Sequence, residues 1–180
     1  MLHSLQYPPL KDIANLEGKG NFAVSKYYQW PFRPFYRHKF RMIVDMMRGE
    51  HYSRLLDFGA GSRIFKPELL RHANFVSCVD KDSVINPLWR FNAIVCASVL
   101  EFTHLYHILN MLQGLMHPAS VLYVASPMDS WATRWYFKLI KDSYIRHPHG
   151  VIKQAIEKYF IIKEYKEWLG LYFCLKAIKR

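Results

Sequence analysis

Apolar residues along the chain follow two periods, one typical of buried strands and one typical of helices. Short, nearly continuous apolar runs occur at residues 54–58, 75–79, 91–98 and 120–125. Apolar residues at helical spacing occur at residues 67–73, 104–115, 131–145 and 151–159. Two further strand-like runs, 161–168 and 171–178, flank Gly170 and predict an antiparallel hairpin. Buried strands alternating with helices predict an α/β, Rossmann-like fold with a mostly parallel sheet and a C-terminal antiparallel hairpin.

The first fifty residues follow a different pattern. Residues 27–36 form an aromatic cluster, and Pro31 and Pro34 are expected to prevent a regular helix within it. An amphipathic helix is predicted to follow and to end near Gly49. Its apolar positions are Phe40, Ile43, Val44 and Met47, with Arg37, His38, Lys39 and Arg41 around them. We expect residues 1–50 to form an aromatic and basic arm with a helix that acts as a lid, and residues 51–180 to form the main domain.

Composition and charge narrow the classes of partner. The 180-residue chain is 51% hydrophobic, enough for one buried core, and its formal charge of +11 favours anionic partners such as nucleic acid or acidic lipid. Dispersed lysines and arginines also keep an aromatic-rich protein in solution. No apolar run approaches the roughly 18–20 residues that span a bilayer, and no signal peptide is visible. The three cysteines lack metal or redox spacing, so we expect reduced thiols and a cytoplasmic protein. Nothing indicates an oligomeric state.

Residues able to contact a ligand gather where the predicted strands end. Two glycines one residue apart let the backbone turn sharply after the first strand and approach a ligand closely. Asp80 ends the next strand, where a carboxylate can accept hydrogen bonds from a ribose diol. An isolated glycine pair would also suit a plain strand-to-helix turn. The candidate residues of the turn are Asp57, Phe58, Gly59, Ala60, Gly61 and Ser62.

Taken together, these segments resemble the class I S-adenosylmethionine-dependent methyltransferases. LLDFGAGS is similar to the first motif of that family, and FVSCVD to its second strand with the ribose-binding acid. FNAIVCASVLEFTH is similar to the fourth strand and the cofactor-contacting turn after it, and ASVLYVASP to the fifth strand. The resemblance extends from about Ser53 to Ile178.

The resemblance implies a role for each matching residue. The backbone from Gly59 to Gly61 would hold the methionine part of S-adenosylmethionine, and Asp80 would hold the ribose hydroxyls. The adenine and the sulfonium would lie beside Ala97, Ser98 and Val99, and Lys81 and Glu101 complete the cofactor-binding set. His104 begins a helix near the expected methyl group, so it is the candidate general base; a helix-capping or surface histidine is the alternative. No metal is expected, and the product would be S-adenosylhomocysteine.

The sequence departs from the family pattern at two places. Arg63 stands where the family usually has a third glycine, and its side chain either lies outward or reaches the methionine carboxylate. Only residues 81–90 join the second strand to the next one, against a helix, a strand and a helix in the family. Ten residues reach about 33 Å at most, which covers the required crossing of roughly 22 Å but leaves no room for those elements. We therefore predict that one edge strand is missing and that Pro87, Leu88 and Trp89 lie across the sheet. The adenine is then exposed, or covered by Trp89 or by the N-terminal arm.

Three functions fit this sequence. A methyltransferase acting on a small-molecule or lipid-like acceptor is favoured, because no N-P-P-Y type motif for methylating base amino groups follows the strand at residues 91–98. An RNA methyltransferase is suggested by the charge and by aromatic residues able to stack on bases. A methyltransferase-like binding protein without turnover is suggested by Arg63 and the shortened connection.

Overall fold

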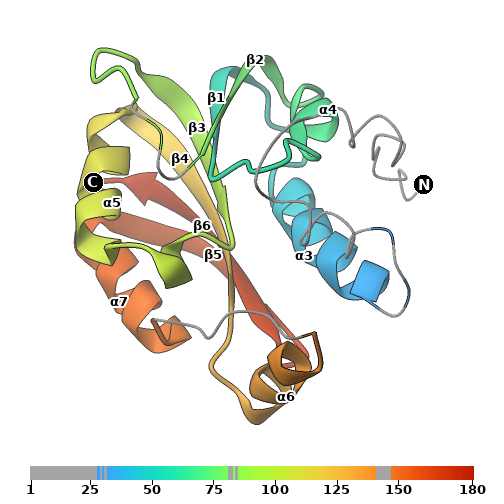
Figure 1. Ribbon diagram of the computed structural model, residues 1–180. Helices are drawn as coiled ribbons and strands as arrows, with labels where there is room; N and C mark the ends of the chain where they lie inside the picture. The colour runs from blue at the N-terminus through green and yellow to red at the C-terminus, as the bar shows by residue number, and fades with distance from the viewer. Residues whose placement is uncertain (1–27, 29, 31, 81–82, 84, 141–146) are drawn as a thin grey trace.

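The computed structural model describes residues 28, 30, 32–80, 83, 85–140 and 147–180 (Figure 1). Most of the predicted N-terminal arm, the end of the helix predicted to reach residue 145, and Lys81 therefore lie outside the described residues. Among the described helices, none has the length and apolar content needed to cross a bilayer.

A six-stranded sheet with the order β2-β1-β3-β4-β6-β5 carries the fold. The parallel strands are β1 (Tyr52–Phe58), β2 (Ala73–Val79), β3 (Phe91–Ala97) and β4 (Met116–Pro127). The hairpin of β5 (Phe160–Trp168) and β6 (Tyr172–Lys179) joins the sheet through antiparallel pairing of β6 with β4. The predicted α/β fold with a parallel sheet and a terminal antiparallel hairpin is confirmed.

Helices cover both faces of the sheet (Figure 1). One face carries α3 (Phe32–Met46) and the short α4 (Lys66–Leu69). The other carries the 3-10 helix η1 (Leu100–Phe102), α5 (Leu105–Gly114) and α7 (His149–Tyr159). Neighbouring residues such as Leu55 and Leu56 point into the two opposite cores, which explains why the strands read as continuous apolar runs. The last helix, α6 (Trp131–Ile140), follows the carboxyl end of β4.

The link from β2 to β3 is as short as predicted, but its side chains lie elsewhere. β2 stands at the end of the strand order, and the described residues form no further edge strand beside it. Leu88 is 82% exposed and is therefore not packed across the sheet, contrary to the prediction. The ring of Trp89 packs edge to face on Phe91, with centroids 6.4 Å apart, at the amino end of β3. The length of β3 separates Trp89, at its amino end, from the glycine turn by about 20 Å. Trp89 therefore does not cover an adenine at that turn.

Helix α3 begins earlier than the sequence predicted. It starts at Phe32 and contains Pro34 in its first turn, so the expectation that prolines exclude a helix before Tyr36 is wrong. Backbone N–H groups of the first turn have no intrahelical acceptor, and a proline there therefore loses no hydrogen bond. The predicted apolar stripe is confirmed, because Phe40, Ile43 and Met47 are buried against the sheet.

Two other elements differ from the prediction in length. Helix α4 spans four residues and not seven, because His72 O already accepts a 2.8 Å hydrogen bond from Tyr52 N and β2 begins at Ala73. Strand β4 begins at Met116, before the predicted run at residues 120–125, and a register shift between Phe91 and Ala93 accommodates the added residues.

A half-buried polar cluster links the start of β1 to strands β4 and β6. Tyr123 Oη donates to Glu50 Oε2 at 2.8 Å, and Glu50 also accepts from Tyr52 Oη and Lys176 Nζ. The two tyrosine hydroxyls lie 2.6 Å apart. Burial alone raises the pKa of Glu50, but its hydrogen bonds with Lys176 and the two tyrosines outweigh burial and hold the pKa below its usual value.

Replacing Glu50 by glutamine removes this charge and is expected to lower the free energy of unfolding by about 1 kcal/mol at neutral pH. A carboxyl whose pKa is depressed in the folded state contributes stability above its unfolded pKa and loses it as the pH falls through the folded pKa. The difference between wild type and Glu50→Gln should therefore disappear in acid. Urea titrations from pH 7 to pH 3 measure it, with the exposed Glu157→Gln as the control; a pH-independent difference would contradict the role of the charge.

Candidate functional site

Asp57 and Asp80 lie at the carboxyl ends of neighbouring parallel strands. Phe58 of β1 pairs in register with Val79 of β2. Asp57 directly precedes Phe58 and Asp80 directly follows Val79, so both acids lie next to the same residue pair. The turn is fastened there, because Val79 O accepts hydrogen bonds from Gly59 N at 2.7 Å and Ala60 N at 3.1 Å. In an open α/β sheet this end is where ligands bind.

The two glycines of the turn have different surroundings. Both have left-handed backbones, with φ of +76° at Gly59 and +48° at Gly61. A Cβ atom at Gly59 would overlap Val99 Cγ2, whereas one at Gly61 would meet no atom of the described residues within 4 Å. Gly59 is therefore required by contact with the turn after β3, and none of the described residues restricts Gly61 in this way.

Arg63, at the position where the family usually has a third glycine, has a left-handed backbone. Its φ is +58°, its side chain is exposed, and its N–H donates to Ala60 O at 2.8 Å. The left-handed conformation costs a non-glycine residue about 1 kcal/mol. Of the two positions expected for this guanidinium, the structure has the outward one, and the turn keeps its shape without the third glycine.

Asp57 is a buried acid with an unsatisfied oxygen. It is 2% exposed, and its Oδ2 has no hydrogen-bond partner among the described residues. Burial raises its pKa to about 7. A buried polar atom without a partner costs about 1–3 kcal/mol, and such atoms point to a ligand or an ordered water.

A second buried carboxyl lies under the turn that follows β3. Glu101 is fully buried, and its Oε2 accepts a hydrogen bond from the hydroxyl of Ser126 at 2.9 Å. Burial raises its pKa to about 7, and its backbone N–H, the charge of Lys39 and the nearby serine hydroxyls offset only part of that effect. Its Oε1 has no partner among the described residues. Glu101 therefore links the turn after β3 to the end of β4.

Lys39 is a member of this site that the sequence analysis missed. It lies on α3, is 4% exposed, and donates from Nζ to Ser98 Oγ at 2.5 Å. Ser98 itself has a left-handed backbone, with φ of +58°, at the end of β3. The available signal was helical spacing, because Lys39 falls on the same stripe as Tyr36, Phe40 and Ile43 and not on the polar side. Through Lys39, α3 reaches the predicted cofactor-contacting turn.

The remaining predicted residues occupy different depths. Phe58 and Val99 are buried in the core, and Ala60, Ser62 and Ala97 are half-buried at the strand ends. The exposed His104 precedes α5 and makes no side-chain capping bond, which excludes the capping alternative. Nearby, His147 Nε2 lies 2.9 Å from Thr103 O, and His147 N donates to Glu101 O at 3.2 Å.

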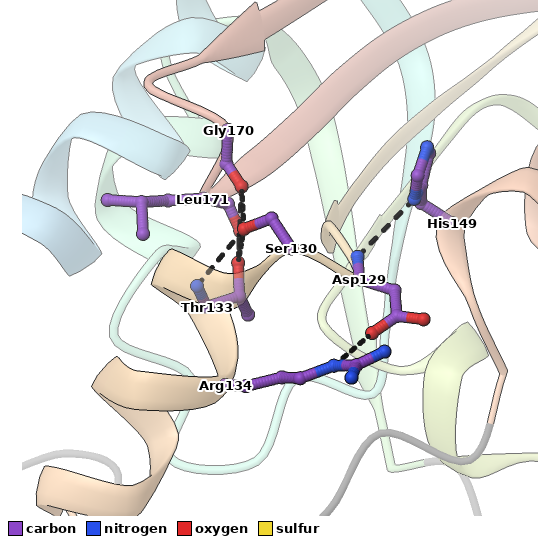
Figure 2. A network of polar contacts seen from close by, with 7 residues as sticks. All are labelled: Asp129, Ser130, Thr133, Arg134, His149, Gly170 and Leu171. Atoms are coloured by element: carbon purple, nitrogen blue, oxygen red, sulfur yellow. Dashed lines mark hydrogen bonds and ion pairs between the residues drawn. The ribbon is translucent and has the colours of Figure 1, made fainter.

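Helix α6 is anchored beside this end of the sheet (Figure 2). Ser130 Oγ accepts from Thr133 N at 3.1 Å and donates to Gly170 O at 2.5 Å. Thr133 Oγ1 donates to Leu171 O at 3.0 Å, and Asp129 forms a 2.9 Å ion pair with Arg134. These bonds hold the start of α6 against the β5–β6 turn.

Solved structures with the same fold include methyltransferases. The N-methyltransferase NodS from Bradyrhizobium japonicum, in complex with S-adenosyl-L-homocysteine, matches with a TM-score of 0.68 and 12% sequence identity, over 88% of this chain and 96% of NodS. An S-adenosylmethionine-dependent methyltransferase from Mesorhizobium loti matches with a TM-score of 0.62 and 10% identity, over 78% and 97% of the two chains. No protein-family model matches the sequence, and no curated protein matches it.

The chain therefore has the class I methyltransferase fold, shortened between β2 and β3. The same fold also matches the cyclase SpnF, with a TM-score of 0.56 and 13% identity over 79% of this chain and 80% of that one. The residues of the site must therefore decide the activity.

The contact between Gly59 and Val99 predicts how substitutions in the turn combine. Gly59→Ala should destabilise the fold by about 3 kcal/mol through steric overlap and backbone strain, and Gly61→Ala by about 1 kcal/mol through strain alone. Adding Val99→Ala should recover part of the loss at Gly59 and none at Gly61. Chemical denaturation of the single and double variants measures this coupling, and purely additive effects at Gly59 would show that the contact does not restrict the turn.

Proposed function

We propose that the chain is a methyltransferase that uses S-adenosylmethionine. The observation that carries the proposal is the convergence of Asp57, the glycine turn and Asp80 at the carboxyl ends of β1 and β2. The residues fit this cofactor. The Oδ2 of Asp57, which no described residue contacts by a hydrogen bond, suits its positive groups, and no described atom stands within 4 Å of the Cβ position of Gly61, where its amino-acid part would lie.

Each predicted residue has a role in this proposal. The backbone of Gly59, Ala60 and Gly61 binds the methionine part, with Ser62 beside it, and Asp80 accepts hydrogen bonds from the ribose hydroxyls. Ala97, Ser98 and Val99 line the space for the adenine and the sulfonium, above the buried Glu101. The cofactor supplies an electrophilic methyl group, so the chain itself mainly orients donor and acceptor. His104 receives a proton if the acceptor must lose one.

The acceptor that we favour is a small, apolar or lipid-like molecule. Large apolar side chains stand exposed on α6, which follows the carboxyl end of β4, and on the β5–β6 turn bonded to it, where they can contact such a molecule. Residues 1–50 act as a lid in this proposal. The contact of Lys39 with Ser98 supports it, because it joins α3 to the cofactor-contacting turn.

Two other functions have observations in their favour. The charge of +11 and the exposed tryptophans also suit an RNA acceptor. The arginine in the third-glycine position and the shortened connection suit a binding protein without turnover. Release of S-adenosylhomocysteine with RNA or with apolar acceptors separates the three, because a binding protein releases none with either.

Asp80→Ala is expected to weaken S-adenosylmethionine binding about tenfold to a hundredfold, because hydrogen bonds to a charged group are lost. Asp80 is exposed, so the melting temperature of the ligand-free protein should not change. Calorimetric titration with S-adenosylmethionine and S-adenosylhomocysteine measures the effect, with Asp45→Ala on α3 as the matched exposed acid. An unchanged dissociation constant would refute the ribose role of Asp80.

Cofactor affinity is also expected to depend on the ionisation of Asp57. A ligand with positive groups favours the carboxylate, and the free protein holds this carboxyl at a pKa of about 7. Affinity should therefore rise with pH below 7, by up to about tenfold per pH unit, and level off above it. Titrations from pH 6 to pH 8 measure this rise, and Asp57→Asn should bind weakly with no such rise. A pH-independent affinity in the wild type would show that the cofactor does not interact with this carboxylate.

A further inference from the structure

Large apolar side chains stand in solvent at one end of the molecule. Trp131 and Trp135 on α6 are 82% and 61% exposed, and Leu169 in the β5–β6 turn is 73% exposed. Trp30, two residues before α3, is 83% exposed. Tryptophan is normally well buried, so exposed tryptophans gathered at one end mark an interaction surface.

The orientation of α6 is fixed by its anchored face. Thr133 is fully buried and bonded to the β5–β6 turn (Figure 2). Trp131, Trp135 and Lys138 are exposed. The spacing of four and seven residues from Trp131 places these side chains in one stripe along the helix. The helix therefore presents two indoles and an ammonium group outward from a rigid support.

The neighbouring elements extend this surface. Ser130 Oγ bonds to Gly170 O, which places the start of α6 beside Leu169. The ring of His38 on α3 lies 4.7 Å from that of Trp168, so the amino-terminal half of α3 meets the same turn. Figure 1 shows α6, the tip of the hairpin and the start of α3 together at the lower end of the molecule. We call Trp131, Trp135, Lys138 and Leu169 the docking face.

The charges at this end indicate which partner fits. Lys138 is exposed, in a chain with a net charge of +11. Of the nearby acids, Asp129 is paired with Arg134, whereas Glu167 accepts a hydrogen bond from the uncharged hydroxyl of Tyr165. Indole rings favour the boundary between lipid headgroups and acyl chains, and lysine and arginine favour anionic headgroups. A helix that combines both suits the plane of a membrane surface.

We propose that the docking face binds the surface of an anionic lipid bilayer, with α6 lying in the headgroup region. Trp131, Trp135 and Leu169 insert among the headgroups, and Lys138 pairs with anionic lipids. Docking itself does not depend on the proposed methyltransferase activity. Its consequence for that activity rests on the proposed function: the site at the strand ends would open toward the bilayer, from which a lipid-like acceptor could enter.

Co-sedimentation of the full chain with vesicles tests the docking face. Binding is expected to vesicles of phosphatidylcholine mixed with phosphatidylglycerol, to weaken with pure phosphatidylcholine, and to fall as salt is added. The double variant Trp131→Ser, Trp135→Ser should bind about a hundredfold more weakly, at roughly tenfold per indole. Leu169→Ser should weaken binding several-fold.

Leu88→Ser is the matched control, because Leu88 is equally apolar, is 82% exposed and lies at the amino end of β3, away from the docking face. It should bind vesicles like the wild type. All of these side chains are exposed, so melting temperatures should be unchanged, which separates lost binding from lost folding. S-adenosylmethionine titration should also be unchanged in the double variant, so failure of docking and failure of the proposed function remain distinguishable.

Several outcomes would overturn the proposal. Wild-type protein that stays in solution with both kinds of vesicle would do so, as would a double variant that binds as well as the wild type. Retention of single-stranded RNA that depends on the two tryptophans, without vesicle binding, would assign the face to nucleic acid. A dimer in solution that separates in the double variant, again without vesicle binding, would assign it to a second copy of the chain.

Discussion

The whole site depends on the way in which the turn after β1 is held. Val79 O accepts the N–H groups of Gly59 and Ala60, which fixes the turn to the end of β2, and the bare Cα of Gly59 lets Val99 approach from the end of β3. Three strand ends are thereby locked into one arrangement. Asp57, Asp80 and Ser98 take their positions from it, because each lies within one residue of the end of one of these strands. A side chain at Gly59 would force the turn or Val99 to move, and the acids would move with it.

Ionisable groups are buried at this end of the sheet, and burial changes their pKa values. Asp57 and Glu101 are both withdrawn from water, and burial raises the pKa of each to about 7. Lys39 brings a cation from α3 into the same region and contacts Ser98. Such groups are costly for stability, since each loses the solvation that it would have at the surface. Their cost is reasonable where a charged ligand can complete their hydrogen bonding, and the outward Arg63 shows that the loop retains its form even where its sequence departs from the family.

The strands and the strand-end acids could be predicted because they depend on local pattern. Continuous apolar runs such as residues 91–97 occur when both faces of a strand are buried, and the glycine pair and Asp80 mark where strands stop. The start of α3 could not be placed, because a proline is excluded from a helix interior and accepted in the first turn, and only the structure shows which applies to Pro34. Lys39 and the Val99 contact were missed because they join residues that are distant in sequence. The role of Trp89 was misjudged because the direction of the link, from one end of the sheet to the other, follows from the strand order.

The attachment of α6 has a consequence for the order in which the molecule is assembled. The carbonyl groups that hold Ser130 and Thr133 belong to Gly170 and Leu171, about forty residues further along the chain. The turn that carries them is set by the pairing of β5 with β6 and of β6 with β4. During synthesis on the ribosome, α6 therefore emerges well before its support exists. Its tryptophans acquire their fixed outward orientation only when the last strand has emerged and joined the sheet.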